Sequence, residues 1–126
     1  MEYVASALVD LSFHEGAPPA DPMARQAEIL AEIGMPAAIG MPQFAHVFAG
    51  DGYSSAYYSY MWSEVMDADA FASFEQASGA FDPERAQALH DHILSKGGSE
   101  DAEALYLAFR GRMPDATALL KNRGLL

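Results

Sequence analysis

The sequence predicts an all-α fold of about six helices joined by short loops. Apolar residues recur at spacings of three and four along much of the chain, as in helices that bury one face. Many alanines, which favour helix, contribute to the 51% hydrophobic content. Asp-Pro steps and glycines divide the sequence where helices typically begin and end. No internal repeat or linker interrupts the 126 residues, so we expect a single helical domain over residues 1–126.

The N-terminal part is expected to form two helices followed by an irregular segment. In chain order, these are a helix over residues 2–15, a loop over 16–22, a helix from Pro22 to Gly34 and an irregular segment over 34–52. Asp21 is the expected cap of the second helix, because it directly precedes a proline in the first helical position. Within the irregular segment, FAHVF is compatible with a short strand, although no partner strand is evident.

The C-terminal part is expected to be mostly helical. The expected helices run from about Ser54 to Gln76, from Asp82–Pro83 to Gly97–Gly98, from Ser99 to near Gly111, and from Pro114 to Gly124. The first of them contains no glycine or proline. Asp82 and Ser99 are the expected caps of the next two, because their side-chain oxygens can accept hydrogen bonds from the first-turn N–H groups.

Composition and charge exclude several classes of function. Eighteen acidic residues against seven basic ones give a net charge of −11, which argues against binding nucleic acid or an anionic membrane. The absence of cysteine excludes disulfides, thiolate zinc sites and a cysteine nucleophile. No stretch approaches the ~18 apolar residues that span a bilayer, and the N-terminus lacks the basic region of a signal peptide. We expect a cytoplasmic protein, with the periplasm as the alternative.

Two histidine motifs are poor candidates for a metal site. His14–Glu15 begins the zinc-protease pattern H-E-x-x-H, but a glycine follows and the second histidine is missing. We expect His14 to lie at a helix C-terminus, where a cation is favourable. His90 and His92 are two residues apart, so their rings diverge on a helix and a solvated face is expected.

The segment Phe109–Pro114 carries two arginines around a glycine. Such a pair is able to bind a carboxylate or a phosphate group. In so acidic a chain, we expect Arg110 and Arg112 to pair with aspartate or glutamate side chains instead.

Tyrosine is concentrated directly after the glycine-flanked turn at Ala49–Gly52. Tyr53, Tyr57, Tyr58 and Tyr60 fall within eight residues. If Ser54 caps the long helix, Tyr57 and Tyr60 lie on one helical face with Glu64. The rings then either belong to the core or form a row of phenol donors that can bind a peptide carbonyl or a developing oxyanion. Burying four hydroxyls in a small core requires a partner for each, which favours the donor row.

Other motifs accompany the tyrosine-rich run from His46 to Phe71. They are Leu8–His14, Gly79–Asp82, Ile93–Ser99, Phe109–Pro114, Leu119–Leu120 and Gly124–Leu125. Together they resemble the C-terminal part of the M3 family of zinc metallopeptidases, which includes thimet oligopeptidase, bacterial oligopeptidase A and peptidyl-dipeptidase Dcp. The resemblance covers nearly the whole chain, and the bacterial Dcp and oligopeptidase A branch is the most similar.

The resemblance implies a segment of a largely helical clamshell with zinc at the floor of a deep channel. The family's zinc ligands, H-E-x-x-H and a later glutamate, match no residues of this sequence. We therefore expect zinc in the parent enzyme, no metal ligand here, and no catalytic zinc bound by this chain. By motif position, Tyr57 and Tyr60 match the family's functional tyrosines, which assist oxyanion and substrate binding. The matching substrate-binding residues of the flexible glycine-rich loop are His46, Tyr53, Gly50 and Gly52.

These observations predict the C-terminal substrate-binding segment of a zinc-dependent oligopeptidase or peptidyl-dipeptidase that hydrolyses short peptides. The chain alone is expected to be inactive. Its expected partners are short peptides and the remainder of the peptidase catalytic domain, with self-association through the apolar surfaces that the segment exposes. The alternative is a stand-alone, non-catalytic helical module that binds peptides or a protein partner, because the chain begins with methionine and has a plausible core of its own.

Overall fold

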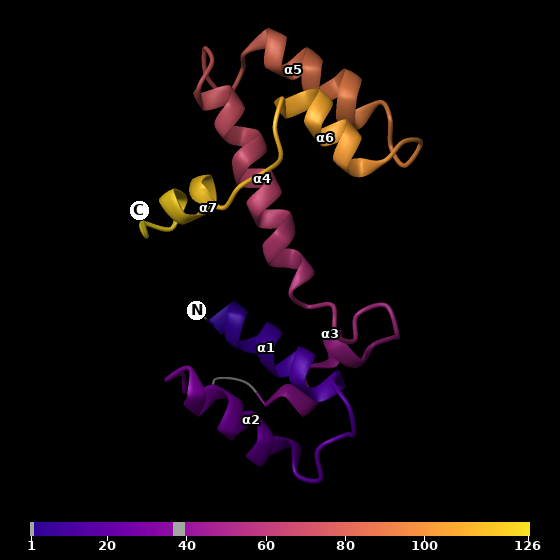
Figure 1. Ribbon diagram of the computed structural model, residues 1–126, viewed down its shortest axis with the longest axis vertical. Coiled ribbons are helices and arrows are strands. Elements are labelled where there is room, and N and C mark those ends of the chain that lie inside the picture. The colour runs from indigo at the N-terminus through magenta and orange to yellow at the C-terminus, as the bar shows by residue number, and fades with distance from the viewer. Residues whose placement is uncertain (1, 37–39) are drawn as a thin grey trace. The chain divides into compact units, whose positions relative to one another are not determined.

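The computed structural model describes residues 2–36 and 40–126, and their regular elements are all helical (Figure 1). These residues contain seven α-helices, five of them seven residues or longer, and no strand, which confirms the predicted all-α class. The chain divides into two compact units, residues 1–60 and 61–126, which are described separately. Whether they form the single domain expected from the sequence stays a prediction. Among the described residues, no helix combines the length and apolar character needed to cross a membrane.

The first unit contains the N-terminal helices. They are α1 (Glu2–His14), α2 (Pro22–Glu32), the 3-10 turn η1 (Met41–Gln43) and α3 (Ala45–Phe48). The predicted cap of α2 is confirmed, because the Asp21 carboxylate accepts hydrogen bonds from the backbone N–H groups of Met23 and Ala24, both at 3.0 Å. Beyond the end of α2, Gly34 adopts a left-handed conformation with φ 65°, as expected for a glycine that ends a helix.

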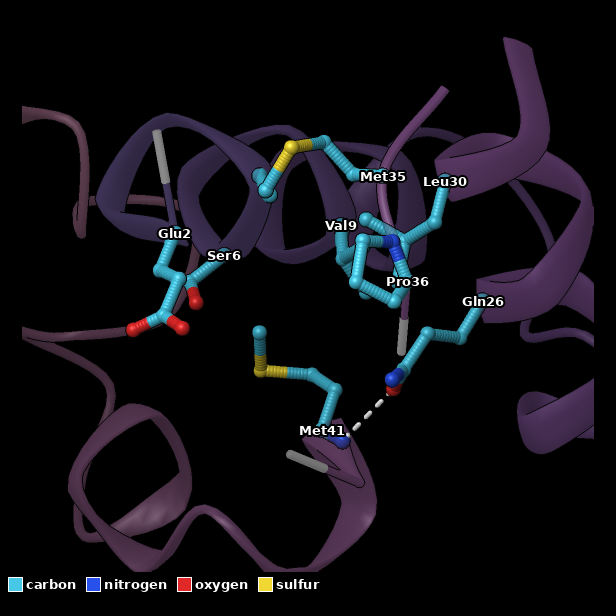
Figure 2. A pocket seen from close by; sticks show the side chains of 9 residues that line it. Glu2, Ser6, Val9, Gln26, Leu30, Met35, Pro36 and Met41 are labelled. Carbon is cyan, nitrogen blue, oxygen red and sulfur yellow. Dashed lines mark hydrogen bonds between the residues drawn. The ribbon is translucent and has the colours of Figure 1, made fainter. Parts of the chain in front are cut away.

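The core of the first unit lies between α1, α2, η1 and α3. Its buried residues are Ala5, Val9, Ile29, Leu30, Met41 and Val47. Beside it lies a small cavity of about 40 Å³, roughly enough for one or two water molecules (Figure 2). The buried Gln26 side chain lines this cavity and accepts a hydrogen bond of 2.7 Å from the backbone N–H of Met41. This hydrogen bond gives the buried Gln26 Oε1 a partner and links α2 to η1.

The segment 44–48, which the sequence left compatible with a short strand, does not form one. Residues 45–48 form the short helix α3, with Val47 fully buried. A strand must find its hydrogen bonds on a neighbouring strand, and the described residues contain none. A helical turn instead bonds to itself, as Val47 N–H does to the Phe44 carbonyl at 3.1 Å.

The second unit contains most of α4 and the helices that follow. They are α4 (Ser59–Glu75), which begins in the first unit, α5 (Pro83–Leu89), the π-helical turn η2 (His90–Leu94), α6 (Ala102–Arg110) and α7 (Thr117–Asn122). Beyond α4, two predicted starts are wrong. The cap of α6 is Asp101 rather than Ser99, because the Asp101 carboxylate accepts from Ala104 N–H at 3.1 Å. The last helix begins at Thr117 rather than Pro114.

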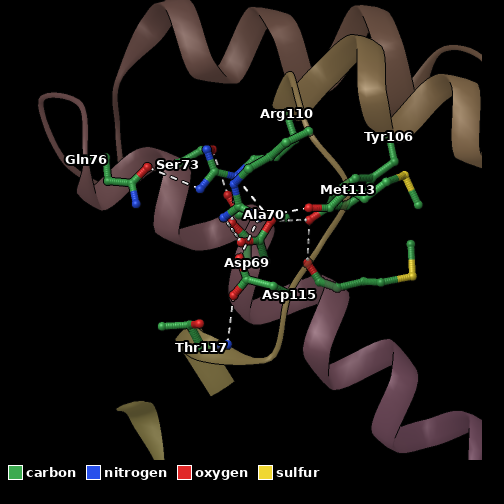
Figure 3. Close-up of polar contacts among 11 residues, drawn as sticks. Asp69, Ala70, Ser73, Gln76, Tyr106, Arg110, Met113, Asp115 and Thr117 are labelled. Carbon is green, nitrogen blue, oxygen red and sulfur yellow. Dashed lines mark hydrogen bonds and ion pairs between the residues drawn. The ribbon is translucent and has the colours of Figure 1, made fainter. Parts of the chain in front are cut away.

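A buried carboxylate ties α4 to α6 and to the segment that follows α6 (Figure 3). Asp69 is 1% exposed and accepts hydrogen bonds from the Tyr106 hydroxyl at 2.8 Å and from Arg110 Nε at 3.2 Å. Arg112 Nη2 also donates to it, and Arg112 Nη1 lies 2.9 Å from Asp115. Burial, followed by the hydrogen bond to Asp69, raises the pKa of Tyr106 above its usual range. The prediction that both arginines pair with acidic side chains is confirmed.

The cap of α5 is expected to make this helix sensitive to acid. The Ser78 hydroxyl, which donates to Asp82 at 2.6 Å, and the Arg85 backbone N–H lower the pKa of Asp82 to about 2. A carboxyl whose pKa is depressed stabilises the fold above its unfolded pKa, and this contribution is lost as the pH falls through the folded value. Between pH ~4 and ~2, the protection of the Arg85 amide, measured as its exchange rate relative to that of an unstructured peptide at the same pH, should therefore fall in the wild type. An Asp82→Ala variant should show little protection at all these pH values; wild-type protection with the same pH profile in the variant would contradict the prediction.

Candidate functional site

Six aromatic side chains of the first unit form a contiguous group, here called the aromatic cluster. Its members are Tyr3, Phe44, His46, Tyr53, Tyr57 and Tyr60. They come from α1, from the residue between η1 and α3, from α3, from the turns after α3 and from the start of α4. The cluster therefore joins segments that are up to 57 residues apart in the sequence, counted from Tyr3 to Tyr60.

His46, on α3, lies at the centre of the predicted site residues. Its Nε2 is hydrogen-bonded to the Tyr60 hydroxyl at 2.8 Å. The ring centroid of His46 lies 4.6 Å from that of Tyr53, 5.7 Å from Tyr60 and 6.1 Å from Tyr57. The four side chains singled out in the sequence are thus brought together, while their roles in binding and catalysis stay predictions.

The local structure that assembles them differs from the expected one. Ser54 does not cap the long helix, because α4 begins only at Ser59 and the Ser54 hydroxyl donates to the Val47 carbonyl at 3.3 Å. Tyr57 therefore precedes the helix, and the helical spacing that was expected to align it with Tyr60 does not apply. The two rings meet instead edge to face, with centroids 5.6 Å apart.

The exposed edge of the cluster carries hydroxyl groups. Tyr53 and Tyr60 are 47% and 41% exposed, so both can meet a ligand from solvent. A phenol has one proton to donate and lone pairs to accept. When His46 Nε2 carries the proton and donates to Tyr60, the Tyr60 O–H remains available to a second acceptor such as a peptide carbonyl or an oxyanion. The His46–Tyr60 pair can therefore prepare a hydrogen-bond donor.

Tyr57 is fixed in place by the first helix. Its ring stacks on that of Tyr3, with centroids 4.8 Å apart and planes inclined by 22°. The Tyr3 hydroxyl donates to the Tyr57 carbonyl at 2.8 Å. Phe44 meets the ring of Tyr57 edge-on, at 5.2 Å. Packing on these sides leaves the Tyr57 ring few alternative positions.

A buried carboxylate lies beneath the same segment. Asp10 of α1 is 0% exposed, and its two oxygens accept hydrogen bonds from the backbone N–H groups of Ser55 and Tyr57, each at 3.0 Å. His14 Nδ1 lies 2.8 Å from the Asp10 carbonyl and 3.1 Å from its Oδ1. This structural role of Asp10 was not predicted. A single carboxylate amid apolar residues of an amphipathic helix was the available signal.

The bound segment contains a strained residue. Ser55 has φ 61°, the one positive value at a non-glycine residue in the described part of the chain. A left-handed conformation at such a residue costs about 1–3 kcal/mol and persists only where the surroundings hold it. The hydrogen bond from Ser55 N–H to the buried Asp10 is one such restraint.

The two glycines of the predicted site have no local steric reason to be glycine. Neither Gly50 nor Gly52 has a positive φ, and a Cβ built on either meets no atom within 4 Å. Both positions are exposed. The open space beside them leaves the backbone of this turn accessible to a ligand, which is compatible with their predicted substrate-binding role.

No metal centre is evident in the described part of the chain. There, no three histidine, aspartate or glutamate side chains gather closely enough to hold an ion. His14 is the last residue of α1, and its Nδ1 is hydrogen-bonded to the Asp10 carbonyl. This is the helix C-terminal position that the sequence predicted for His14. His90 instead contacts its neighbour Asp91, at 2.9 Å. The described residues therefore do not fit a zinc site, and no catalytic step is assigned to a metal on this chain.

Comparison with known proteins places the chain in a peptidase family. The sequence model of peptidase family M3 matches residues 2–125. Oligopeptidase A of Escherichia coli is 49% identical over 82 residues, which is 65% of this chain and 12% of that protein. Oligopeptidase A of Haemophilus influenzae is 47% identical over 83 residues, or 66% of this chain and 12% of that protein. Dipeptidyl carboxypeptidase of Salmonella typhimurium is 33% identical over 132 aligned positions, covering 98% of this chain and 19% of that protein.

These curated relatives are much longer than the chain, which spans between 12% and 19% of their lengths. The match of the family model nevertheless extends over nearly all of the 126 residues, and it confirms the family indicated by the tyrosine-rich motifs. The chain belongs to peptidase family M3.

Proposed function

We propose that this chain is the C-terminal substrate-binding segment of a zinc-dependent oligopeptidase or peptidyl-dipeptidase that hydrolyses short peptides. The observation that carries the proposal is the convergence of His46, Tyr53, Tyr57 and Tyr60 in one aromatic cluster. Similarity to oligopeptidase A and dipeptidyl carboxypeptidase supports peptides as the substrate class.

In this proposal the chain binds the substrate and stabilises charge. The hydroxyls of Tyr57 and Tyr60 donate to the substrate backbone and to the oxyanion of the tetrahedral intermediate, where a fixed donor is most effective. His46 and Tyr53, together with the turn that contains Gly50 and Gly52, contact the peptide at the edge of the cluster. Zinc would supply the activated water, but its ligands would lie on the remainder of the catalytic domain.

The remainder of the catalytic domain is accordingly the proposed protein partner. Several large apolar side chains of the second unit are exposed, as expected for surfaces that another part of a larger protein covers. They include Trp62 at 61%, Phe81 at 97% and Leu94 at 68%. The same exposure underlies the proposal that the isolated chain associates with itself.

The test compares the isolated 126-residue chain with the native polypeptide that carries this sequence. Each is purified to homogeneity and incubated with zinc and a set of short peptides. The native polypeptide should be several times longer than 126 residues and should cleave the peptides until a chelator is added, while the isolated chain should cleave none. Chelator-sensitive cleavage by the isolated chain would overturn the proposal. A native polypeptide of 126 residues that binds peptides without cleaving them would instead establish the stand-alone binding module.

A further inference from the structure

We propose that Asp10 and Tyr3 are positioning residues that hold Tyr57 in the orientation in which it acts on the substrate. This inference rests on the proposed function, because it assigns to α1 the task of placing a tyrosine that binds the oxyanion. Neither residue needs to touch the substrate. Each acts on the backbone of Tyr57, and Tyr3 also acts on its ring.

Asp10 is a fully buried carboxylate. A carboxylate that is 0% exposed is costly unless hydrogen bonds replace its water. Both oxygens are used on the segment that carries the tyrosine, one by Ser55 N–H and one by Tyr57 N–H, each at 3.0 Å. Because two separate oxygens bind two amides of one short segment, the carboxylate fixes the orientation of that segment as well as its position.

Tyr57 is held at both its backbone N–H and its backbone carbonyl. Its N–H donates to Asp10, and its carbonyl accepts from the Tyr3 hydroxyl at 2.8 Å. Asp10 and Tyr3 are seven residues apart, which is two turns of a helix, so both lie on the same face of α1. The Tyr3 ring also stacks on the Tyr57 ring. The helix α1 therefore holds both the backbone of Tyr57 and one face of its ring.

Residues 49–58 contain turns but no helix, and Ser55 is left-handed with φ 61°. Such a segment has alternative conformations of comparable energy unless something selects one. Asp10 binds the strained residue and Tyr57 together, so it selects the conformation that brings Tyr57 beside Tyr60 and His46. A device of this kind increases catalytic rate by pre-organising a donor rather than by binding the substrate more tightly.

The test uses the native polypeptide with zinc and a short peptide substrate. Tyr3→Phe removes one hydrogen bond but keeps the ring, and Asp10→Asn keeps one acceptor oxygen. Glu15→Gln, just beyond the end of α1, is the matched control because Glu15 is exposed. Asp10→Asn and Tyr3→Phe should each lower kcat about tenfold, with KM changed less than about twofold, and Glu15→Gln should change neither.

The decisive comparison repeats both substitutions in a Tyr57→Phe background. Residues that act through the Tyr57 hydroxyl should cause no further loss of kcat there, because the hydroxyl that they position is absent. Equal losses in both backgrounds would overturn the proposal and indicate a general structural role. Hydrogen exchange at the Tyr57 amide provides a second readout, and it should accelerate in Asp10→Asn but not in Glu15→Gln. An unchanged exchange rate would also overturn the proposal.

Failure of the proposed function has a different signature. If Tyr57→Phe itself leaves kcat unchanged, Tyr57 does not bind the oxyanion, and the positioning role in catalysis is overturned with it. Accelerated exchange in Asp10→Asn would then still show that the carboxylate restrains the segment. If Tyr57→Phe leaves kcat unchanged and Asp10→Asn leaves the exchange rate of the Tyr57 amide unchanged, the first result refutes the catalytic assignment and the second refutes the restraint.

Discussion

Asp69→Ala is expected to destabilise the second unit by about 3–5 kcal/mol, the usual cost of removing one member of a buried ion pair. The carboxylate is 1% exposed and serves three donors, from Tyr106, Arg110 and Arg112. Its removal leaves the Arg110 guanidinium, only 10% exposed, without its buried counter-charge. This loss is a large fraction of the about 5–15 kcal/mol that stabilises a typical domain, so the variant should unfold at a much lower urea concentration than the wild type.

The measurement is urea unfolding followed by far-UV circular dichroism, with Asp67→Ala as the control. Asp67 is an exposed carboxylate on the same helix, α4, and its replacement should shift the free energy of unfolding by less than about 0.5 kcal/mol. Asp69→Asn keeps an acceptor oxygen and should fall between the two. If Asp69→Ala unfolds at the same urea concentration as Asp67→Ala, the network contributes little to stability.

Helix class and three of the six predicted helix starts follow from local rules that the sequence displays. Asp21 before Pro22 and Asp82 before Pro83 both begin helices as predicted, because the cap bonds only to the next few residues. Asp101 was missed as the start of α6 for a related reason. Ser99 and Asp101 are both residue types that cap helices well, so residue type alone does not choose between them, and in the structure Asp101 is the cap.

The error at the start of α4 has a non-local cause. Nothing between Ser54 and Ser59 forbids a helix, and the expected helix was continuous there. In the structure, two of these backbone N–H groups donate to Asp10, which is 45 residues away from Ser55. A buried carboxylate that competes for backbone amides is able to override helix propensity, and a reading of local sequence does not reveal which distant residue competes.

The candidate site was recognised for a partly different reason from the one that assembles it. The density of tyrosines and the family motif singled out His46, Tyr57 and Tyr60, and these side chains do come together, while their roles stay predictions. The expected mechanism of alignment, a shared helical face for Tyr57 and Tyr60, is wrong because Tyr57 lies outside α4. The part that Tyr3 plays was not predicted, since its contact with Tyr57 joins residues 54 positions apart.

Tyr57→Phe is expected to lower kcat of the native polypeptide by about 10²–10³-fold, the usual loss on removing one donor to an oxyanion. The substitution deletes only the hydroxyl, so the ring can still stack on Tyr3 at 4.8 Å and meet Phe44 at 5.2 Å. The backbone bonds to Asp10 and Tyr3 are also retained, because they involve main-chain atoms of residue 57. The loss should therefore appear in kcat with little change in KM, as for an interaction made only in the transition state.

The adjacent tyrosine provides the control for this prediction. Tyr58 is 49% exposed and lies beside Tyr57 in the chain, yet it is not a member of the aromatic cluster. Tyr58→Phe removes the same hydroxyl from the same segment and should leave kcat within about twofold of the wild type. A comparable loss in both variants would show that any tyrosine of this segment matters equally, and would contradict a specific oxyanion role. A large loss of kcat that is confined to Tyr57→Phe, with unchanged thermal unfolding, would tie the peptidase activity to the Tyr57 hydroxyl. Tyr57 is the tyrosine whose backbone both Asp10 and Tyr3 hold.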